Sequence, residues 1–340
     1  MFIYRSTIVC LLLLFPFLFK PGEQQLYTIS GFAQGTGYSL RYYAATERVS
    51  KVQVDSLLQQ IDTSMSLYKP GSLINQFNSA ERYLRVDDGF RTVLQKSFEI
   101  YQKTAGRFDV TVAPLVQLWG FGPFPVQRFP DSTEVRKTLK QVGMSKLKLK
   151  GNMLYKANPE IRIDLNGIAQ GYSVDHVAGF LKAQGIQSYM VEIGGEVVVN
   201  GLKPDGSGYR IGIEGPVPEH ADPKTAVGTS VFRHIVELKQ GAITTSGNFN
   251  KYLKYKDGKI SHLINPKTGY PLNNQMISVT VYANDAITAD GYDNALMAMD
   301  IEEAMAFTKQ EKLEAYFIYH KPDGRVADTL TSGFKKLLIN

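Results

Sequence analysis

Apolar side chains recur along this chain with two spacings, which predict a mixture of helices and strands. A spacing of three to four residues, with a capping residue before it or glycine after it, indicates an amphipathic helix. We expect helices at residues 52–61, 87–106, 166–183, 288–299 and 301–311. Shorter stretches that alternate, or that are rich in tyrosine and β-branched residues, indicate strands. We expect strands at residues 37–44, 161–165, 189–193, 280–283 and 315–320.

Residues 161–193 are the most informative of these predicted units. A strand is expected to end at Leu165, and Asn166-Gly167 to begin a helix that stops at Gly185 before the chain returns as a strand. The polar junction of such a unit is a usual contact point for a phosphate or a ribose. Elsewhere helices and strands are interleaved without a repeated unit, which predicts an α+β fold. Residues 201–230, with several Gly and Pro, are expected to form turns and a hairpin, and are a candidate lid.

Residues 1–22 are expected to be a signal peptide, or an N-terminal anchor that is not cleaved. An apolar run from Ile8 to Phe19 follows Arg5. Twelve helical residues span roughly 18 Å, less than the ~30 Å hydrocarbon core of a bilayer. A short apolar centre with a positive flank is typical of a secretory signal. The only cysteine, Cys10, lies inside this run, so the rest of the chain suits an oxidising compartment outside the cytoplasm.

The composition is that of a globular protein large enough for one large domain or two lobes. Of 340 residues, 44% are hydrophobic and 21% are charged, which excludes collagen-like, low-complexity and wholly disordered chains. The net charge of +6 is spread along the chain without long basic clusters. We therefore expect an anionic small molecule as ligand and no nucleic-acid partner.

Several common catalytic sites are excluded because their motifs are missing. The sequence has no Gly-x-Ser-x-Gly elbow, no Gly-x-Gly-x-x-Gly fingerprint and no phosphate loop ending in Gly-Lys-Ser/Thr. Its five histidines have no metal-ligand spacing, and a single cysteine cannot build a cysteine-based zinc site.

Three polar segments that contain glycine are each open to a structural and a functional interpretation. Residues 106–122 join an Arg, an Asp and several aromatics at a helix exit, and a helix cap with an aromatic plug explains them. In residues 164–172 the polar side chains could cap a helix, but Gly167 and Gly171 would let the backbone approach a ligand. In residues 244–269 the stretch after His262 makes a turn by itself, and this histidine is equally well explained as a packed side chain.

A fourth segment, residues 288–295, carries oxygen ligands at helical spacing. Asp290, Asp293 and Asn294 stand at i, i+3 and i+4, hence on one face of the predicted helix. Such oxygens suit a hard cation such as Mg²⁺. The alternative is that acidic residues complement the helix dipole. Gly291 favours a ligand, because glycine lowers helix stability.

Taken together and in order, these segments resemble the FAD:protein FMN transferase family, also called ApbE-like proteins. The resemblance extends over most of the chain after the apolar run. It is carried by residues 65–78, 107–109 with 119–122, 164–172, 192–195, 245–247, 262–269 and 289–290. Each motif is weak alone, but seven motifs in the right order are specific.

The resemblance implies an exported enzyme of α+β, T-fold-like architecture, with mixed sheets, packed helices and an FAD cleft between lobes. Residues 23–340 would form this domain. Members bind FAD and Mg²⁺ and attach FMN through its phosphate to a Thr or Ser hydroxyl of an acceptor protein, releasing AMP. Flavin or nucleotide contacts are implied at Gln34, Tyr68, Arg107, Phe108, Asp109, Asp164, Gln170 and Ile264. Metal ligands are implied at the carbonyl of Gly167 and the side chains of Asp290 and Asn294.

The sequence departs from the family pattern in the candidate site. Gln34 stands where Met is common, and Asn294 stands where Thr is usual, although an amide oxygen can also ligate Mg²⁺. Gln170 replaces a frequent Lys and removes a positive charge near the phosphates. Asn265 replaces Asp, which argues against a catalytic role at that position.

In the implied reaction the attacking hydroxyl belongs to another protein, so this chain needs no nucleophile of its own. We expect Asp290 to act through the metal, and His262 to deprotonate or orient the acceptor hydroxyl. An FAD carrier without activity and a Mg²⁺-dependent FAD pyrophosphatase, which would give FMN and AMP, are the alternatives. The expected acceptor is a subunit of a respiratory membrane complex or another exported flavoprotein. The expected location is the periplasm or the outer face of the inner membrane.

Overall fold

The computed structural model describes residues 24–217, 230–248, 252–255 and 258–339. The predicted signal or anchor at residues 1–22 lies outside the described residues, as does part of the candidate lid, at 218–229. Within the described ranges, every helix is too short or too polar to cross a bilayer.

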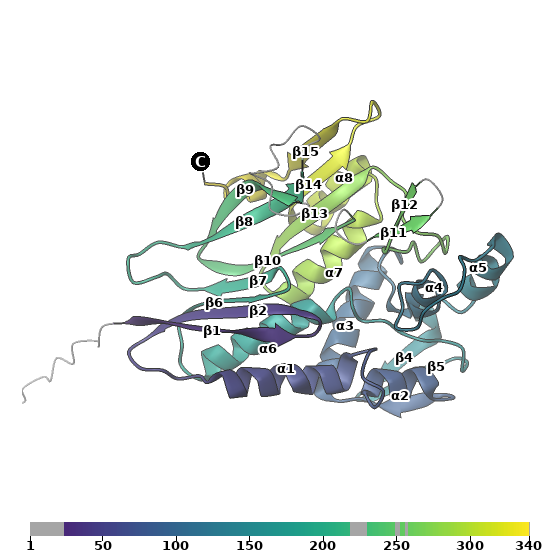
Figure 1. The fold of residues 1–340 in the computed structure, drawn as a ribbon, viewed down its shortest axis with the longest axis horizontal. Coiled ribbons are helices and arrows are strands. Elements are labelled where there is room, and N and C mark those ends of the chain that lie inside the picture. The colour runs from purple at the N-terminus through teal and green to yellow at the C-terminus, as the bar shows by residue number, and fades with distance from the viewer. Residues whose placement is uncertain (1–23, 218–229, 249–251, 256–257, 340) are drawn as a thin grey trace, which may run out of the picture.

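An eight-stranded antiparallel sheet forms one lobe of the molecule (Figure 1). Its strands follow the order β1-β2-β6-β7-β10-β13-β14-β15. They span β1 (Gln25–Ala33), β2 (Thr36–Ala44), β6 (Ser188–Ile193), β7 (Glu196–Asn200), β10 (Gln240–Gly247), β13 (Met276–Ala283), β14 (Glu314–His320) and β15 (Val326–Leu330). Strand β13 lies inside the sheet and is buried over nearly its whole length, with Val279 and Val281 on one face and the buried hydroxyls of Ser278 and Thr280 on the other.

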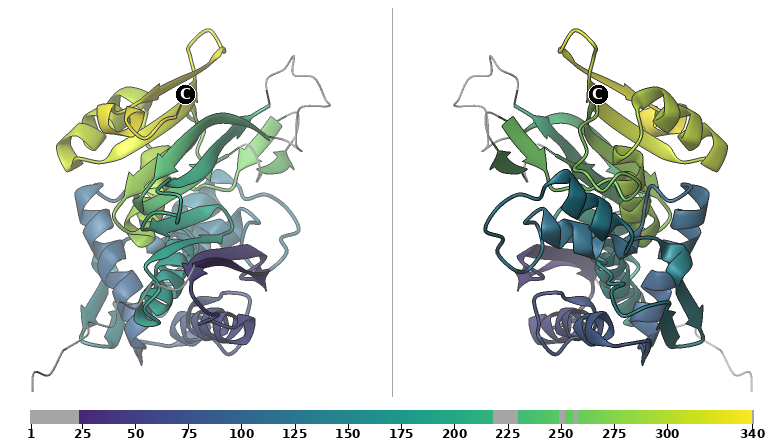
Figure 2. Two further views of the ribbon diagram at one scale, coloured as in Figure 1. Left: turned by 90° about the vertical axis from the view of Figure 1, so that its left-hand side faces the viewer. Right: turned by 90° about the vertical axis from the view of Figure 1, so that its right-hand side faces the viewer.

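Helices cover one face of this sheet. They are α1 (Lys51–Met65), α6 (Ala169–Ala183), α7 (Ala286–Met297) and α8 (Ile301–Glu311). Leu58 of α1 and Val177 of α6 are fully buried in one cluster with Leu40 of β2, because apolar residues recur on one side of each helix. Figure 2 shows α1 beneath the β1–β2 hairpin, and α7 runs against β10 and β13.

The other face is covered by a two-stranded ribbon, β8 (Tyr209–Pro216) and β9 (Ser230–Leu238), and by the short α9 (Ser332–Lys335). Val236 of the ribbon packs in one buried cluster with Val199 of β7 and Ile243 of β10. Of the hairpin expected within residues 201–230, only the first strand lies there, because the second strand begins at Ser230 and runs beyond that range to Leu238.

A second lobe packs beside the sheet and is mainly helical. Its elements are α2 (Leu73–Ser79), β3 (Tyr83–Arg85), α3 (Asp88–Lys103), α4 (Ala113–Leu118), α5 (Ser132–Leu139), β4 (Leu147–Lys150) and β5 (Met153–Lys156), with 3-10 turns at Val110–Val112 and Met144–Lys146. Phe77, Phe90 and Leu154 meet in its core. A small hairpin, β11 (Tyr252–Tyr255) and β12 (Gly258–Ser261), lies near α4 and the end of α7 (Figure 1). The α+β class is therefore confirmed.

The predicted helices are present, with some starts displaced. Asp87 caps α3 as expected and accepts the Phe90 N–H at 2.7 Å. Helix α7 begins at Ala286, not at Thr288, because Asp285 is the cap and accepts the Thr288 N–H. Helix α6 begins at Ala169, after a turn at residues 166–168.

The prediction of a strand at residues 161–165 is wrong. Ile161, Ile163 and Leu165 are buried and Arg162 is exposed, so the alternation is real, but the segment is extended chain inserted into the helical lobe. The Asn78 side chain satisfies its backbone, accepting the Ile163 N–H at 2.8 Å and donating to the Ile163 carbonyl at 3.0 Å. The predicted strand–helix–strand unit therefore lacks its first strand.

Gly171 of α6 and Gly291 of α7 serve helix packing and not a ligand. A Cβ on Gly171 would lie 2.7 Å from the Ala286 carbonyl carbon and 2.8 Å from Asp290 Cβ, so α6 and α7 touch at this point. A Cβ on Gly291 would collide with Ile100 of α3. The expectation that Gly171 and Gly291 make room for a ligand is therefore corrected.

Replacing Gly171 by Ala should destabilise the protein by roughly 1–3 kcal/mol, because the added methyl meets backbone that cannot move aside. Gly179→Ala in the same helix is the matched control, since its position is open and Ala favours helix by about 0.5–1 kcal/mol. Chemical denaturation of both variants measures the difference. Equal stabilities would contradict the close contact.

Candidate active site

A cleft of about 640 Å³ lies between the two lobes. Every predicted site residue except Asp290 lines it. The shared members are Gln34, Tyr68, Arg107, Phe108, Asp109, Asp164, Gly167, Gln170, His262, Ile264 and Asn294. These residues come from segments more than two hundred positions apart, so the fold brings the separate motifs to one place.

One wall of the cleft is formed by residues at the β1–β2 turn and after the ends of α1 and α3, where the chain changes direction. Gln34 sits in the β1–β2 turn with a φ of 55°, and its amide donates to the Ser173 hydroxyl of α6 at 2.9 Å. Gly106, with a φ of 80°, ends α3 and turns the chain so that residues 107–109 run along the cleft. Tyr68 follows α1 and is 65% exposed.

Arg107 and Asp109 are both held by other residues of the protein. The Arg107 guanidinium forms an ion pair with Glu303 of α8, which joins the two lobes at the cleft. The buried Asp109 carboxylate accepts the Thr111 N–H at 2.8 Å, the Thr111 hydroxyl at 2.5 Å and the Met144 N–H at 3.1 Å. Burial raises the pKa of Asp109, and the bonds from Thr111 and Met144 oppose that rise. The Asp109 carboxylate therefore shapes the cleft wall from behind.

The His262 segment forms the opposite wall. Asn265 accepts the N–H groups of Lys267 at 2.9 Å and Thr268 at 3.3 Å, so this side chain builds the turn that its sequence predicts. Trp119 donates from its indole nitrogen to the Gly269 carbonyl at 2.8 Å and ties this turn to α4. The ring of His262 packs edge-on against Phe121, with centroids 6.3 Å apart.

Helix α7 presents buried carboxylates behind the cleft. Asp290 accepts the Gly171 N–H at 2.8 Å, and Asp293 accepts the Thr244 hydroxyl at 2.7 Å. The amide nitrogen of Asn294 lies 3.3 Å from the Gly167 carbonyl oxygen, 3.2 Å from Asp290 Oδ1 and 3.0 Å from Asp293 Oδ1. Asn294 therefore contacts both of the other predicted metal positions, Gly167 and Asp290.

This arrangement fits a hard cation. Oxygen atoms surround the Asn294 amide nitrogen, which carries a partial positive charge. Rotation of this amide by about 180° would place its oxygen there instead, as a further ligand for an ion. Among the described residues, no three His, Cys, Asp or Glu side chains could hold a metal ion together. An ion here would therefore take the Gly167 carbonyl and the Asn294 amide besides the Asp290 carboxylate.

The electrostatics of α7 also favour a positive charge. Burial raises the pKa of Asp290 to about 7, and Asp175 adds to the rise. Burial and repulsion from Asp290 raise the pKa values of Asp293 and Glu196. Glu196 Oε2 is inaccessible and makes no hydrogen bond with any residue that the structure describes. A cation beside these groups would offset the free energy of burying them.

Sequence reasoning missed two acidic residues that act on this wall. Asp175 of α6 accepts the first two N–H groups of α7, from Ala286 and Ile287, at 2.8 Å each. Glu196 begins β7 beside Asp290, just before the apolar residues 197–199. In the sequence, a single charged residue next to an apolar strand could have identified Glu196. Asp175 gives no such signal, because its sequence pattern is that of an ordinary exposed helix residue.

Replacing Asp175 by Ala should cost roughly 1–3 kcal/mol of stability, because two N–H groups at the start of α7 lose their acceptor. Asp175→Asn should recover part of the loss, since its amide oxygen still accepts. Denaturation together with hydrogen exchange at Ala286 and Ile287 measures both effects. Unchanged exchange in Asp175→Ala would contradict this role.

Comparison with known proteins agrees with this geometry. A family model described as "ApbE family" matches residues 34–317. A Vibrio cholerae protein named "FAD:protein FMN transferase" is 36% identical over 326 residues, 94% of each chain, and one of the same name from Haemophilus influenzae is 31% identical over 93% of this chain and 92% of its own. The solved structure "Flavin Transferase ApbE from Vibrio cholerae" superposes with a TM-score of 0.82 at 35% identity, covering 93% of this chain and all of the other. This chain therefore belongs to the ApbE family.

Proposed function

We propose that this chain is an FAD:protein FMN transferase that depends on a divalent cation, Mg²⁺ in the first instance. Its substrate would be FAD, and its product an acceptor protein carrying FMN on a Thr or Ser hydroxyl. The observation that carries the proposal is that the implied flavin, nucleotide and metal positions meet at one interlobe cleft. The names of its relatives support the same activity.

The diphosphate of FAD is anionic and repels an oxygen nucleophile until its charge is neutralised. A bound Mg²⁺ would neutralise the phosphate oxygens and the charge that develops on departing AMP. Asp290, Asn294 and the Gly167 carbonyl would hold it. The start of α6, which has no side-chain cap, places the positive end of its dipole beside Gly167 and Gln170. This helix end partly compensates for the charge that Gln170 lacks compared with Lys.

His262 would take the proton of the acceptor hydroxyl as that oxygen attacks phosphorus. Its ring lines the cleft and is oriented by Phe121. The acceptor is proposed to be an exported protein or a respiratory-complex subunit, because the apolar run at residues 8–19 resembles an export signal. The same run supports a periplasmic or membrane-anchored location.

Asp290→Asn should reduce FMN transfer by at least about tenfold, because replacing a residue at a metal site commonly costs about 10–100-fold in metal affinity or activity. To test transfer, the protein is incubated with FAD, Mg²⁺ and the exported and membrane proteins of a strain that lacks this chain. Transfer is measured as in-gel flavin fluorescence after denaturation. Thermal melting with and without Mg²⁺ gives a readout independent of activity, and the shift should vanish in Asp290→Asn. Asp300→Asn, at the cap of α8, is the control. A Mg²⁺ shift retained in Asp290→Asn would exclude this metal position.

His262→Ala should lower the transfer rate by about 10²–10⁴-fold, the usual effect of losing a general base. FAD affinity, measured by flavin fluorescence quenching, should stay within a few-fold, because Phe121 and the Asn265 turn remain. His320→Ala on β14, which is exposed and bonds to the Gly324 carbonyl, is the control. Unchanged turnover in His262→Ala would show that another group handles the proton. Formation of free FMN and AMP without labelled protein would instead identify a pyrophosphatase.

A further inference from the structure

A second cavity of about 550 Å³ opens beside the interlobe cleft, and we call it the side groove. It shares Tyr68, Val116 and Asp164 with the cleft. Its other walls are α2, α4, the loop at residues 122–124 and the extended chain at Arg162. Any molecule lying in the side groove therefore reaches the cleft without crossing the protein surface.

The three amide side chains of the side groove are already engaged by the protein itself. The Asn75 amide donates to the Leu67 and Lys69 carbonyls, and Asn78 bonds both backbone groups of Ile163. Gln117 likewise bonds the N–H and the carbonyl of Phe124. The groove therefore offers mainly apolar contacts, which do not suit the phosphates, riboses and ring nitrogens of a dinucleotide.

One charge in the side groove remains available. Arg162 is exposed and forms no ion pair with any described residue, and its charged neighbour Lys156 repels it. Lys156 itself is satisfied by the carbonyls of Asn78, Pro159 and Ile161 at 3.1–3.3 Å. A carboxylate on an incoming molecule would find its complement at Arg162.

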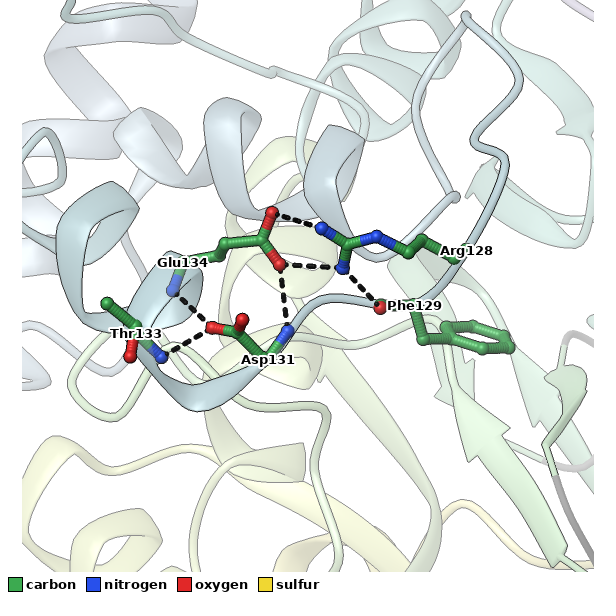
Figure 3. A network of polar contacts seen from close by, with 5 residues as sticks. All are labelled: Arg128, Phe129, Asp131, Thr133 and Glu134. Carbon is green, nitrogen blue, oxygen red and sulfur yellow. Dashed lines mark hydrogen bonds and ion pairs between the residues drawn. The ribbon is translucent and has the colours of Figure 1, made fainter.

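The loop that rims the side groove is held at both ends while its apolar side chains stay exposed. Near the start of the loop, the Gln117 side chain holds the backbone of Phe124. At its far end Arg128 binds the Glu134 carboxylate with two bonds of 2.8 Å (Figure 3). Between these anchors Phe124 is 66% exposed and Val126 is 39% exposed. An exposed aromatic beside a cavity can serve as an anchor for a bound protein segment.

We propose that the side groove docks the segment of the acceptor protein that carries the flavin-receiving hydroxyl. The segment would be extended, with apolar side chains against Phe124 and the groove wall and a carboxylate at Arg162. Its hydroxyl would then enter the cleft past Tyr68 and Asp164, where FAD already occupies the remaining space. This inference rests on the proposed function and names the surface that selects its protein substrate.

A third cavity of about 500 Å³, beside the β1–β2 turn and the end of α1, also adjoins the cleft. Its charged residues Asp62 and Lys69 already face each other at 3.7 Å, so no charge there awaits a partner. The side groove is therefore the better docking surface on charge and on apolar exposure.

The experiment compares Phe124→Ser and Arg162→Glu with matched controls outside all three cavities. Phe232→Ser replaces an equally exposed aromatic on β9, and Lys239→Glu reverses an exposed charge after it. Transfer is measured with FAD, Mg²⁺ and limiting amounts of exported and membrane proteins from a strain lacking this chain. FAD affinity is measured separately by fluorescence quenching.

Both groove variants should transfer FMN about tenfold more slowly while binding FAD within twofold of wild type, and both controls should behave like wild type. Phe124→Trp should retain transfer, which excludes a folding defect at that position. A tenfold loss of FAD affinity in the groove variants would assign the groove to the nucleotide and overturn the inference, as would unchanged transfer. If the wild-type chain labels no protein, the proposed function fails, and the docking surface fails with it.

Discussion

The close contact between α6 and α7 is the constraint on which the rest of the site depends. Glycine at position 171 lets the two helices meet, and its N–H binds the Asp290 carboxylate at 2.8 Å. The same contact brings the Gly167 carbonyl, one turn earlier, against the Asn294 amide on the next turn of α7. Because both helices also pack on the sheet, the core fixes the positions of Asp290 and Asn294, while the turn before α6 presents the Gly167 carbonyl to them.

This arrangement buries acidic groups at a cost in stability. Desolvation is the largest cause of the raised pKa values of Asp290, Asp293 and Glu196, and repulsion from Asp290 raises the pKa values of Asp293 and Glu196 further. Natural cores rarely keep such groups without a partner, because an unpaired buried charge is strongly destabilising. The hydrogen bonds from the Gly171 N–H to Asp290 and from the Thr244 hydroxyl to Asp293 offset part of this cost.

The cleft itself depends on a few contacts between lobes. Trp119 holds the His262 turn by its bond to Gly269, and Arg107 pairs with Glu303. These contacts join segments that are far apart in sequence, and they keep the walls at a fixed separation. The side groove continues the cleft along the helical lobe, so one molecule can occupy the cleft while another enters from the side.

The sequence by itself determined the five longest described helices, four of the strands and the turn at Asn265, and its family resemblance supplied eleven of the residues that line the cleft. Local spacing, caps and glycines are sufficient for such elements because they act over a few residues. Only the tertiary structure decided that residues 161–165 are not a strand, that Gly171 and Gly291 serve helix packing, and that Asp175 and Glu196 stand behind Asp290. The reason is that alternation reports which side chains are buried, whereas the backbone partner, here Asn78, and the neighbours of a buried charge are supplied by distant parts of the chain.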